Sequence, residues 1–521
     1  MQLRLTLIAV AILCANVQPV LADEREDLET LRQTTLNLIE ALVQNGILTQ
    51  DKADALIRDA KRKAVETASG QGSAGKVVRV PYVPQTVRNE IKEELRQEVV
   101  AQAKSEGWAT PNSLPSWLQG TKWESDLRLR FQQDHFARGN FSPLQLSLAE
   151  DPITIPNSQA MNDRWRARLR FGMEKQIGEM TSAGFRIATG NLSDPLSTNQ
   201  TLGNSFDRYT LGVDRAYLKL EPTRWLSMAG GRIANPFFST DLVWHPDLNF
   251  DGLAATLKPT LFENTQATLT AGAFPLQQVD PNAAVGTATA AKSKWLFGSQ
   301  LGVDWQADKS KVKLGLAYYL YSHIAGLPNS GDYSIDPTSA GLYNQTVPQF
   351  RQRGNSIFNI NQAVTGNPPQ LYGLAAKFHE LDLTGSVDMA NLDPIHVVLT
   401  GDYVKNIGFD RAEILQRTGR DITPRTIGYQ AKLTVGTPQI EKRGQWQLFG
   451  AYKYLQRDAV LDAYTDSDFR LGGTDAKGYI IGGSYGLDKN TWLSLRWLSA
   501  DAIDGPPLSI DTLQIDLNAR F

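Results

Sequence analysis

In one short stretch of the chain every second residue is an arginine, and the residues between are apolar: Arg164, Arg166, Arg168 and Arg170 alternate with Trp165, Ala167 and Leu169. Successive side chains of a β-strand point to opposite faces, so this spacing predicts a strand with one cationic and one apolar face. Other cations with the same alternation lie nearby: Arg128, Arg130, Arg186, Arg215, Lys219 and Arg232. The alternation places all of these side chains on the inner face of the first five strands, so we predict that one wall of the enclosed space is strongly positive.

A second inward-facing set is acidic and lies later in the chain: Asp304, Asp382, Asp388 and Asp402. Because the two sets occupy different strands, we predict that an electric field crosses the space they enclose. Rows of one sign set ion preference, and the larger cationic set predicts a mild anion preference. The alternative is that Asp126, Asp163, Asp214 and carboxylates of the loops neutralise the arginines. In that case the arginines only stabilise the wall.

Two patterns associated with catalysis lack the context that the chemistry needs. Residues 482–486 match Gly-x-Ser-x-Gly, but a nucleophile there requires a sharp strand-to-helix turn, and the alternation of this stretch continues with no helix after it. The histidines lie far apart without ligand spacing: His135, His245, His323, His379 and His396. We therefore predict no enzyme, no catalytic residue, no metal and no cofactor, with an outer-membrane hydrolase as a remote alternative.

An acidic stretch contains Asp458, Asp462, Asp466, Asp468 and Asp475. It lacks the glycine and glutamate positions of a calcium loop. Binding of divalent ions that bridge lipopolysaccharide is one interpretation, but we predict that these carboxylates are solvated charges on the exterior.

Alternation at period two continues from Lys122 to the end of the chain. It predicts sixteen strands, at about 122–133, 163–174, 182–191, 208–220, 225–233, 250–258, 264–274, 295–305, 311–321, 372–389, 395–405, 426–436, 445–455, 477–487, 491–499 and 509–521. Seven short turns alternate with eight long loops, which is typical of a transmembrane antiparallel β-barrel. A soluble double sheet or propeller also has period two, but its connections would not alternate in this way. About sixteen strands enclose more space than side chains fill, so we expect a water-filled lumen.

The final strand carries its apolar residues on one face and ends on an aromatic. Leu513, Ile515 and Leu517 share a face with terminal Phe521, which we interpret as the membrane-assembly signal. Tryptophans gather near strand ends, where a barrel has its interfacial girdles: Trp123, Trp225, Trp295, Trp305, Trp446, Trp492 and Trp497.

The N-terminal part has a different organisation. Residues 1–22 read as a secretory signal peptide, and the only cysteine, Cys14, lies inside it. Residues 23–107 have helical periodicity and predict an α-helical periplasmic segment. Residues 108–121 form a linker rich in proline and tryptophan, and residues 122–521 form the barrel. The mean hydropathy of −0.31 does not decide between a soluble protein and a barrel, because a barrel averages its two faces.

Several short motifs resemble the putative porin family of Gram-negative outer membranes. They are residues 82–84 (Tyr-Val-Pro), 107–109 (Gly-Trp-Ala), 115–118 (Pro-Ser-Trp-Leu), 126–130 (Asp-Leu-Arg-Leu-Arg), 466–475 (Asp-Ser-Asp-Phe-Arg-Leu-Gly-Gly-Thr-Asp) and 478–479 (Gly-Tyr). The resemblance covers nearly the whole mature chain. It implies a β-barrel porin with an N-terminal helical extension, and it supplies no catalytic residue or substrate.

We therefore predict an outer-membrane porin for passive diffusion of small hydrophilic solutes and ions. Its expected partners are outer-membrane lipids and lipopolysaccharide, the barrel assembly machinery, the solutes and, in a homotrimer, copies of itself; no nucleic acid is expected. The alternative is a tether or adhesin whose helical segment binds peptidoglycan or a partner. Two segments are candidates for an inward-folded constriction, residues 235–249 and 322–371, and we favour the first.

Overall fold

The computed structural model describes residue 58 and residues 120–149, 157–279 and 292–521. The predicted signal peptide and, apart from Arg58, the predicted helical segment and nearly all of the linker lie outside these residues. Residues 112–521 form one compact unit of the chain. No helix in the described ranges is both long and apolar enough to cross a membrane.

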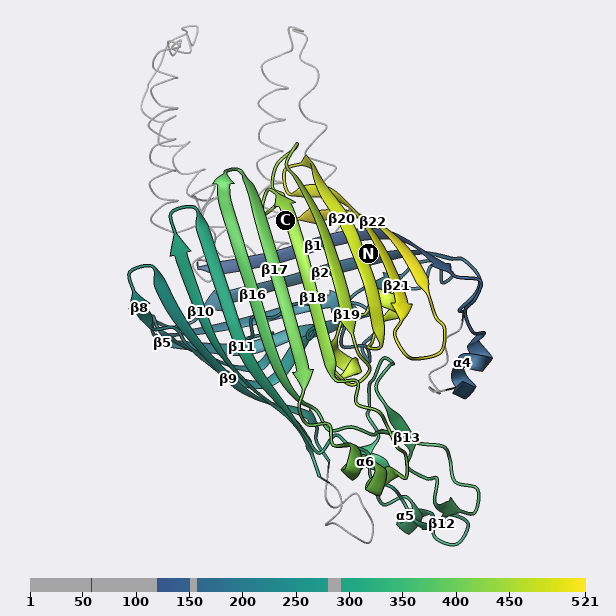
Figure 1. The fold of residues 1–521 in the computed structure, drawn as a ribbon. Helices are drawn as coiled ribbons and strands as arrows, with labels where there is room; N and C mark the ends of the chain where they lie inside the picture. The colour runs from purple at the N-terminus through teal and green to yellow at the C-terminus, as the bar shows by residue number, and fades with distance from the viewer. Residues whose placement is uncertain (1–57, 59–119, 150–156, 280–291) are drawn as a thin grey trace, which may run out of the picture. The chain divides into compact units, whose positions relative to one another are not determined.

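Sixteen long antiparallel strands in the described residues form a closed barrel (Figure 1). The wall consists, in order, of β1 Thr121–Phe136, β2 Asn162–Gln176, β3 Thr181–Thr189, β5 Leu211–Thr223, β6 Leu226–Ala234, β7 Asn249–Leu257, β9 Thr265–Gln277, β10 Lys294–Ala307, β11 Ser310–Ser322, β16 His379–Leu392, β17 Ile395–Asn406, β18 Ile427–Gly436, β19 Trp446–Leu455, β20 Ala476–Asp488, β21 Thr491–Ala502 and β22 Ile510–Arg520. Each strand pairs with the next one in this order, and β22 pairs back with β1. The prediction of sixteen strands is confirmed.

Shorter elements extend the wall or belong to the loops. β4 Gln200–Thr201 and β8 Thr260–Phe262 add to the main sheet. The loops contain β12 Gly331–Asp332, β13 Ile357–Asn359, β14 Val364–Thr365, β15 Tyr372–Leu374, α4 Pro143–Ala149, α5 Pro337–Ala340, α6 Arg411–Thr418, and the 3-10 helices η2 Asn344–Thr346, η3 Asp462–Tyr464 and η4 Phe469–Leu471. Asp410 caps α6 by accepting the N–H groups of Ala412 and Glu413.

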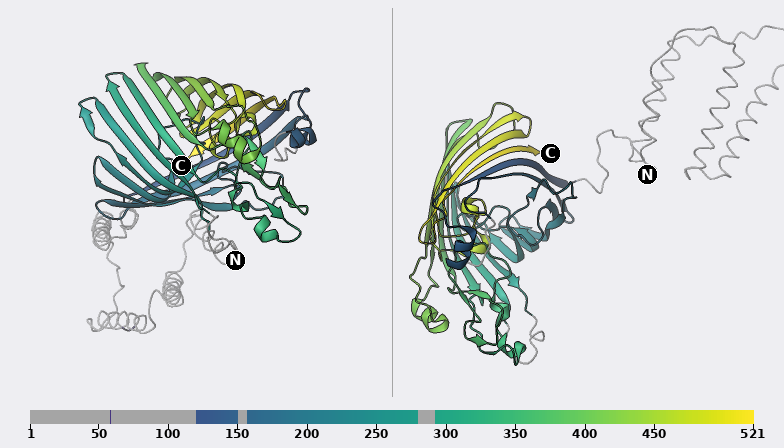
Figure 2. Two further views of the ribbon diagram at one scale, coloured as in Figure 1. Left: turned by 60° about the horizontal axis from the view of Figure 1, so that its bottom comes forward. Right: turned by 90° about the vertical axis from the view of Figure 1, so that its right-hand side faces the viewer.

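The connections divide between the two ends of the barrel. One end carries mostly tight turns, at 177–180, 224–225, 258–264, 308–309, 393–394, 437–445 and 489–490. The other end carries the remaining connections, at 137–161, 190–210, 235–248, 278–293, 323–378, 407–426, 456–475 and 503–509. Figures 1 and 2 show α5 and α6 beyond this second end, which we call the loop end.

The outer surface is apolar because the alternating residues that face outward are mostly leucine, valine and aromatic residues. Leu127, Leu129 and Trp165 are exposed on strands whose arginines are partly or wholly covered. Four exposed tryptophans lie at the turn end of their strands, where they form part of an aromatic girdle: Trp123, Trp225, Trp305 and Trp446.

The last strand closes the barrel. β22 places Gln514, Asp516 and Asn518 on the covered inner face, whereas Leu517 is exposed outside. The backbone N–H of Phe521 donates to the carbonyl of Ser125 at 3.1 Å, and the Phe521 ring is 69% exposed. No sheet edge is therefore left at the junction of the first and last strands.

Candidate functional site: the lumen and its inward loops

The predicted arginines form a ladder on the inner face of β1 and β2. In the register Arg128 stands opposite Arg168, and Arg130 stands opposite Arg166. Arg164 and Arg170 extend the ladder at its two ends, where Arg164 stands opposite Gln132 and Arg170 stands opposite Asp126. Six guanidinium groups are thus gathered on two neighbouring strands.

Aspartates neutralise four of these six arginines. Arg168 and Arg170 both bind Asp126, each at 2.7 Å, and Arg164 binds Asp134 at 2.6 Å. Arg130 is almost completely buried and binds Asp516 of β22 at 2.7 Å and Asp468 of the 456–475 loop at 3.2 Å.

Arg128 and Arg166 differ from the rest of the ladder. The Nη2 atom of Arg128 donates to the side-chain oxygen of Asn199 at 2.5 Å, and Nη2 of Arg166 donates to Oγ of Ser197 at 3.4 Å. Neither arginine forms an ion pair with any residue in the described ranges. Within the described ranges, therefore, no carboxylate lies at ion-pair distance from either guanidinium group.

The remaining predicted cations have other partners. Arg186 binds Asp214 and Glu124, Arg215 binds Asn249, and Lys219 binds Glu221. Of the three proposed neutralising carboxylates, Asp126 and Asp214 do bind arginines, whereas Asp163 accepts from Gln133 instead.

Arg232 lies apart from the arginine ladder. The register pairs it with Ala216, and its Nη1 binds Asp251 at 2.9 Å. Both residues line the cavity that Trp244 and Phe274 also line. Gly231, directly before Arg232, has a φ of +115°, and a Cβ there would lie 2.4 Å from the carbonyl oxygen of Ala216. Only glycine readily adopts this backbone conformation, and because of it the strict alternation of faces does not hold at Arg232.

The four predicted acidic residues lie on the inner face of β10, β16 and β17. Asp304 stands opposite Lys313, and Asp388 binds His396 at 2.7 Å. Asp382 and Asp402 are buried. Glu380 is also buried and lies on the same face of β16 as Asp382, but the prediction did not include it. Asp402 accepts hydrogen bonds from the backbone N–H and the hydroxyl of Thr240.

The segment 235–248 folds into the lumen and contacts opposite walls. Near its start Thr240 binds Asp402 of β17, and Asp241 binds Lys453 of β19 at 3.2 Å. Near its end Asp247 binds Arg170 of β2 at 2.9 Å. The first of the two candidate constriction segments therefore crosses the barrel interior.

Apolar side chains of the segment pack against the inner face of the barrel wall. Phe237 and Trp244 pack edge-on against Tyr319 of β11, with ring centroids 5.1 Å apart in each pair. Phe237 also lies over Gly298 of β10, where a Cβ atom would come within 2.5 Å of its ring. Because Gly298 has no side chain, the ring of Phe237 can pack at this position and the segment can lie inside the barrel. One side of the lumen is thus filled by packed side chains, opposite the arginine ladder.

The acidic 456–475 loop also enters the lumen, and the prediction of solvated exterior carboxylates is wrong. Asp458 and Asp462 are fully buried, and Asp466 and Asp475 are nearly so. Asp458 accepts from Ser356, Asp466 binds Lys453 at 2.9 Å, and Asp468 binds Arg130 and Arg496. Their partners lie on distant strands and loops, which is why the local sequence suggested exposure.

Electrostatics favour the ionised form of the carboxylates that fasten the two loops. Burial would raise the pKa of Asp247, but Arg168 and Arg170 outweigh it and lower the pKa to about 2. Burial likewise opposes ionisation of Asp468 and Asp241, yet Arg130 and Arg496 in the first case and Lys453 in the second hold their pKa values below the usual range. For Asp458, burial outweighs the hydrogen bonds from Ser356 and the charge of Arg457, and it raises the pKa to about 6.

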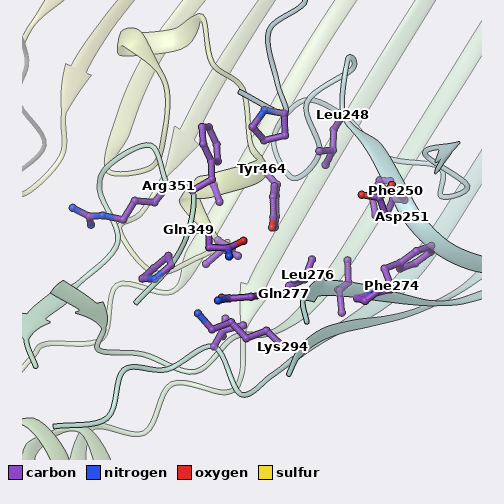
Figure 3. A pocket seen from close by; sticks show the side chains of 18 of the residues that line it. Leu248, Phe250, Asp251, Phe274, Leu276, Gln277, Lys294, Gln349, Arg351 and Tyr464 are labelled. Carbon is purple, nitrogen blue, oxygen red and sulfur yellow. The ribbon is translucent and has the colours of Figure 1, made fainter. Parts of the chain in front are cut away.

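Two cavities open around the inward loops. One, of about 450 Å³, is lined by Trp244, Phe274 and Tyr464 together with Lys294. Figure 3 shows Tyr464, Leu276, Gln277 and Lys294 around the same space. The second, of about 400 Å³, lies against the arginine ladder and shares Asp194, Phe350 and Arg351 with the first.

The catalytic patterns are not assembled into sites. Ser484 lies inside β20, paired with Ser494 of β21 in the strand register, and no turn follows it. Its hydroxyl meets that of Ser494 at 2.8 Å rather than a histidine. Within the described ranges no group of three or more metal-ligating side chains is arranged to hold an ion.

A family model described as putative porin matches residues 32–521. The chain belongs to this family. Membership of this family and the closed barrel support an outer-membrane porin channel. No curated protein matches the chain.

Solved structures with similar folds include several porins. OmpF of Salmonella typhi in complex with daunomycin is 10% identical with a TM-score of 0.41, over 77% of this chain and 98% of that one. OprB of Pseudomonas putida is 10% identical with a TM-score of 0.43, over 82% and 97%. The outer membrane channel DcaP of Acinetobacter baumannii is 10% identical with a TM-score of 0.38, over 77% and 98%.

Proposed function

We propose that this porin is a passive diffusion channel for small hydrophilic solutes and ions, with a mild preference for anions. The observation that supports the preference is the arginine ladder. Asp126 and Asp134 pair with some of its members, but Arg128 and Arg166 have only uncharged partners. Fixed positive charge that faces water raises the local concentration of anions.

The segment 235–248 supports a narrow passage rather than an open tube. It occupies the side of the lumen where its own residues Phe237 and Trp244 pack against Tyr319 of the wall. Solutes would therefore pass between this segment and the ladder, where charge acts over short distances and with less screening than in bulk water.

Reversal potentials across planar bilayers test the proposal. In a KCl gradient we expect the wild-type potential to indicate chloride preference, and Arg128→Ser together with Arg166→Ser to move it toward potassium. Arg208→Ser removes the same charge from an exposed loop position and serves as the control. Arg168 is a poorer choice, because its replacement would also release Asp126 and Asp247.

The outcomes separate the parts of the proposal. An unchanged potential in the double variant would mean that the ladder only braces the wall, and the anion preference would be abandoned. A bilayer that stays electrically silent with correctly folded protein would contradict the channel itself. The tether hypothesis concerns residues 23–107, and deletion of that segment tests it, since a channel keeps its conductance without them.

A further inference from the structure

The cavity beside the arginine ladder has a composition suited to a ligand. It is lined on one side by Arg164 and Arg166 of β2 and on the other by residues 350–353 of the long loop. Its volume of about 400 Å³ lies within the range of small-molecule sites. A site at this position would be met by a solute that enters from the loop end.

Each carboxylate that lines this cavity already has a partner. Asp134 binds Arg164, and Asp468 binds Arg130 and Arg496. Asp194 accepts the backbone N–H groups of Leu196 and Ser197, so it serves the turn of its own loop. None of these groups forms an ion pair with Arg166.

Arg166 is therefore a cation with spare donors at the cavity wall. Of its five N–H donors, one meets the hydroxyl of Ser197 at the long distance of 3.4 Å, and its Nε has no hydrogen-bond partner. A buried donor without a hydrogen-bond partner costs free energy. An incoming acceptor removes this cost when the guanidinium group reorients and donates to it. Arg351 and Arg353 add positive charge from the opposite side.

The rest of the lining is mixed. Phe136, Leu196, Phe350 and Leu471 provide its apolar part, and the polar part consists of Gln132, Asn157, Asn162, Ser197, Gln352 and Ser467. A guanidinium group next to aromatic and aliphatic side chains matches a molecule with a planar carboxylate at one end and an apolar body at the other. A fully hydrated inorganic anion would leave this apolar surface without a partner.

We propose that this cavity binds small organic carboxylates, with the carboxylate at Arg166 and the apolar body against Phe350. The inference rests on the proposed function, because it names the class of solute that the channel retains on its way through. Such a site slows chloride while it is occupied and favours the entry of organic anions over inorganic ones.

Block of the chloride current measures the binding. Benzoate is added on the loop side of single channels of the full-length protein, and neutral benzamide and inorganic phosphate are compared at the same concentrations. We expect benzoate to reduce the current in a saturable way, and benzamide and phosphate to act far more weakly. Arg166→Gln should raise the half-blocking benzoate concentration about tenfold, the loss expected for one charge-assisted contact.

Two further variants keep the test decisive. Arg166→Lys retains the charge without the planar fork, so we expect an intermediate effect. Arg208→Gln removes an exposed loop charge and should leave the block unchanged. Equal block by benzoate and benzamide, equal block by phosphate, or block that neither Arg166 variant alters would overturn the proposal.

Calorimetric titration of benzoate into the protein in detergent micelles separates the two levels of inference. Binding that depends on Arg166 would support the site even if no current were observed, in which case the channel function would fail alone. Normal currents without Arg166-dependent binding would refute the site and leave the channel intact.

Discussion

At the scale of single residues, ion pairs rather than apolar contacts hold the loops to the arginine ladder. Asp247 joins Arg168, Arg170 and the hydroxyl of Thr198, and Asp468 joins Arg130 and Arg496. Buried pairs of this kind are costly to break from one side only, because the remaining charge loses its partner in a poorly hydrated place. The paired arginines therefore hold the loops in place, and we propose that Arg128 and Arg166 act on the solute.

Asp247→Asn tests this role through its pH dependence. The folded-state pKa of about 2 is below the unfolded value, so the charge contributes stability above about pH 4 and loses it as the pH falls toward 2. We expect the variant to lower the free energy of unfolding by about 2 kcal/mol at pH 7 and by clearly less at pH 2. Urea denaturation in micelles at both pH values measures the difference.

The control for this prediction is Asp207→Asn, because Asp207 is exposed and contacts only Asn204. This variant should leave the free energy of unfolding nearly unchanged at either pH. If Asp247→Asn lowered the free energy of unfolding equally at both pH values, the charge of the carboxylate would not be the source of its stabilising effect.

At the scale of elements, the segment 235–248 is held by two kinds of contact. Its residues Phe237 and Trp244 pack against β11, whereas Asp241, which lies between them in the chain, is fixed by Lys453 and by the side-chain amide of Gln430 at 2.8 Å. We therefore predict that the polar contacts set how far the segment extends across the lumen.

Thr240→Val combined with Asp241→Asn removes these polar contacts and leaves the aromatic packing in place. Loss of one partner of a buried pair costs about 3 kcal/mol, which is enough to shift a loop between positions. We expect a larger and noisier single-channel conductance than that of the wild type. Asp332→Asn, in the loop between β11 and β16, is the matched control and should leave conductance as it is. A smaller or equal conductance in the double variant would argue that the constriction lies elsewhere.

At the scale of the whole molecule, closure leaves the last residue outside the wall. β22 is fixed by pairing with both β1 and β21, while the Phe521 ring remains mostly exposed. Because the ring is mostly exposed, we expect it to add little to the stability of the folded barrel, and we propose that Phe521 acts in barrel assembly.

Phe521→Ser tests that explanation. We expect much less protein in the outer membrane of cells, but an unfolding free energy of the refolded barrel within about 0.5 kcal/mol of the wild type, as for other surface substitutions. Quantitative blotting of membrane fractions measures the amount of protein in the outer membrane, and urea denaturation in micelles measures the free energy of unfolding. A normal amount of the variant in the membrane would contradict an assembly role for Phe521.

The sequence was sufficient to predict the barrel. Strand positions such as those around Arg164 and Leu513 follow from alternation, since in a sheet each residue's face depends only on its parity. The prediction was incomplete where that parity is disturbed, as at Gly231 before Arg232. It also omitted Glu380, although this residue has the parity of Asp382 and lies on the same face of β16.

What the sequence determined by itself is therefore the local part: sixteen strands, their two faces, the turn and loop ends, and which side chains point inward. The tertiary structure decided which inward charges remain available to a solute, because that depends on partners far away in the chain, such as Asp468 for Arg130 and Ser197 for Arg166. It also decided that the acidic loop is buried, because burial of a charge depends on the long-range contacts that replace its water, and no local pattern records them.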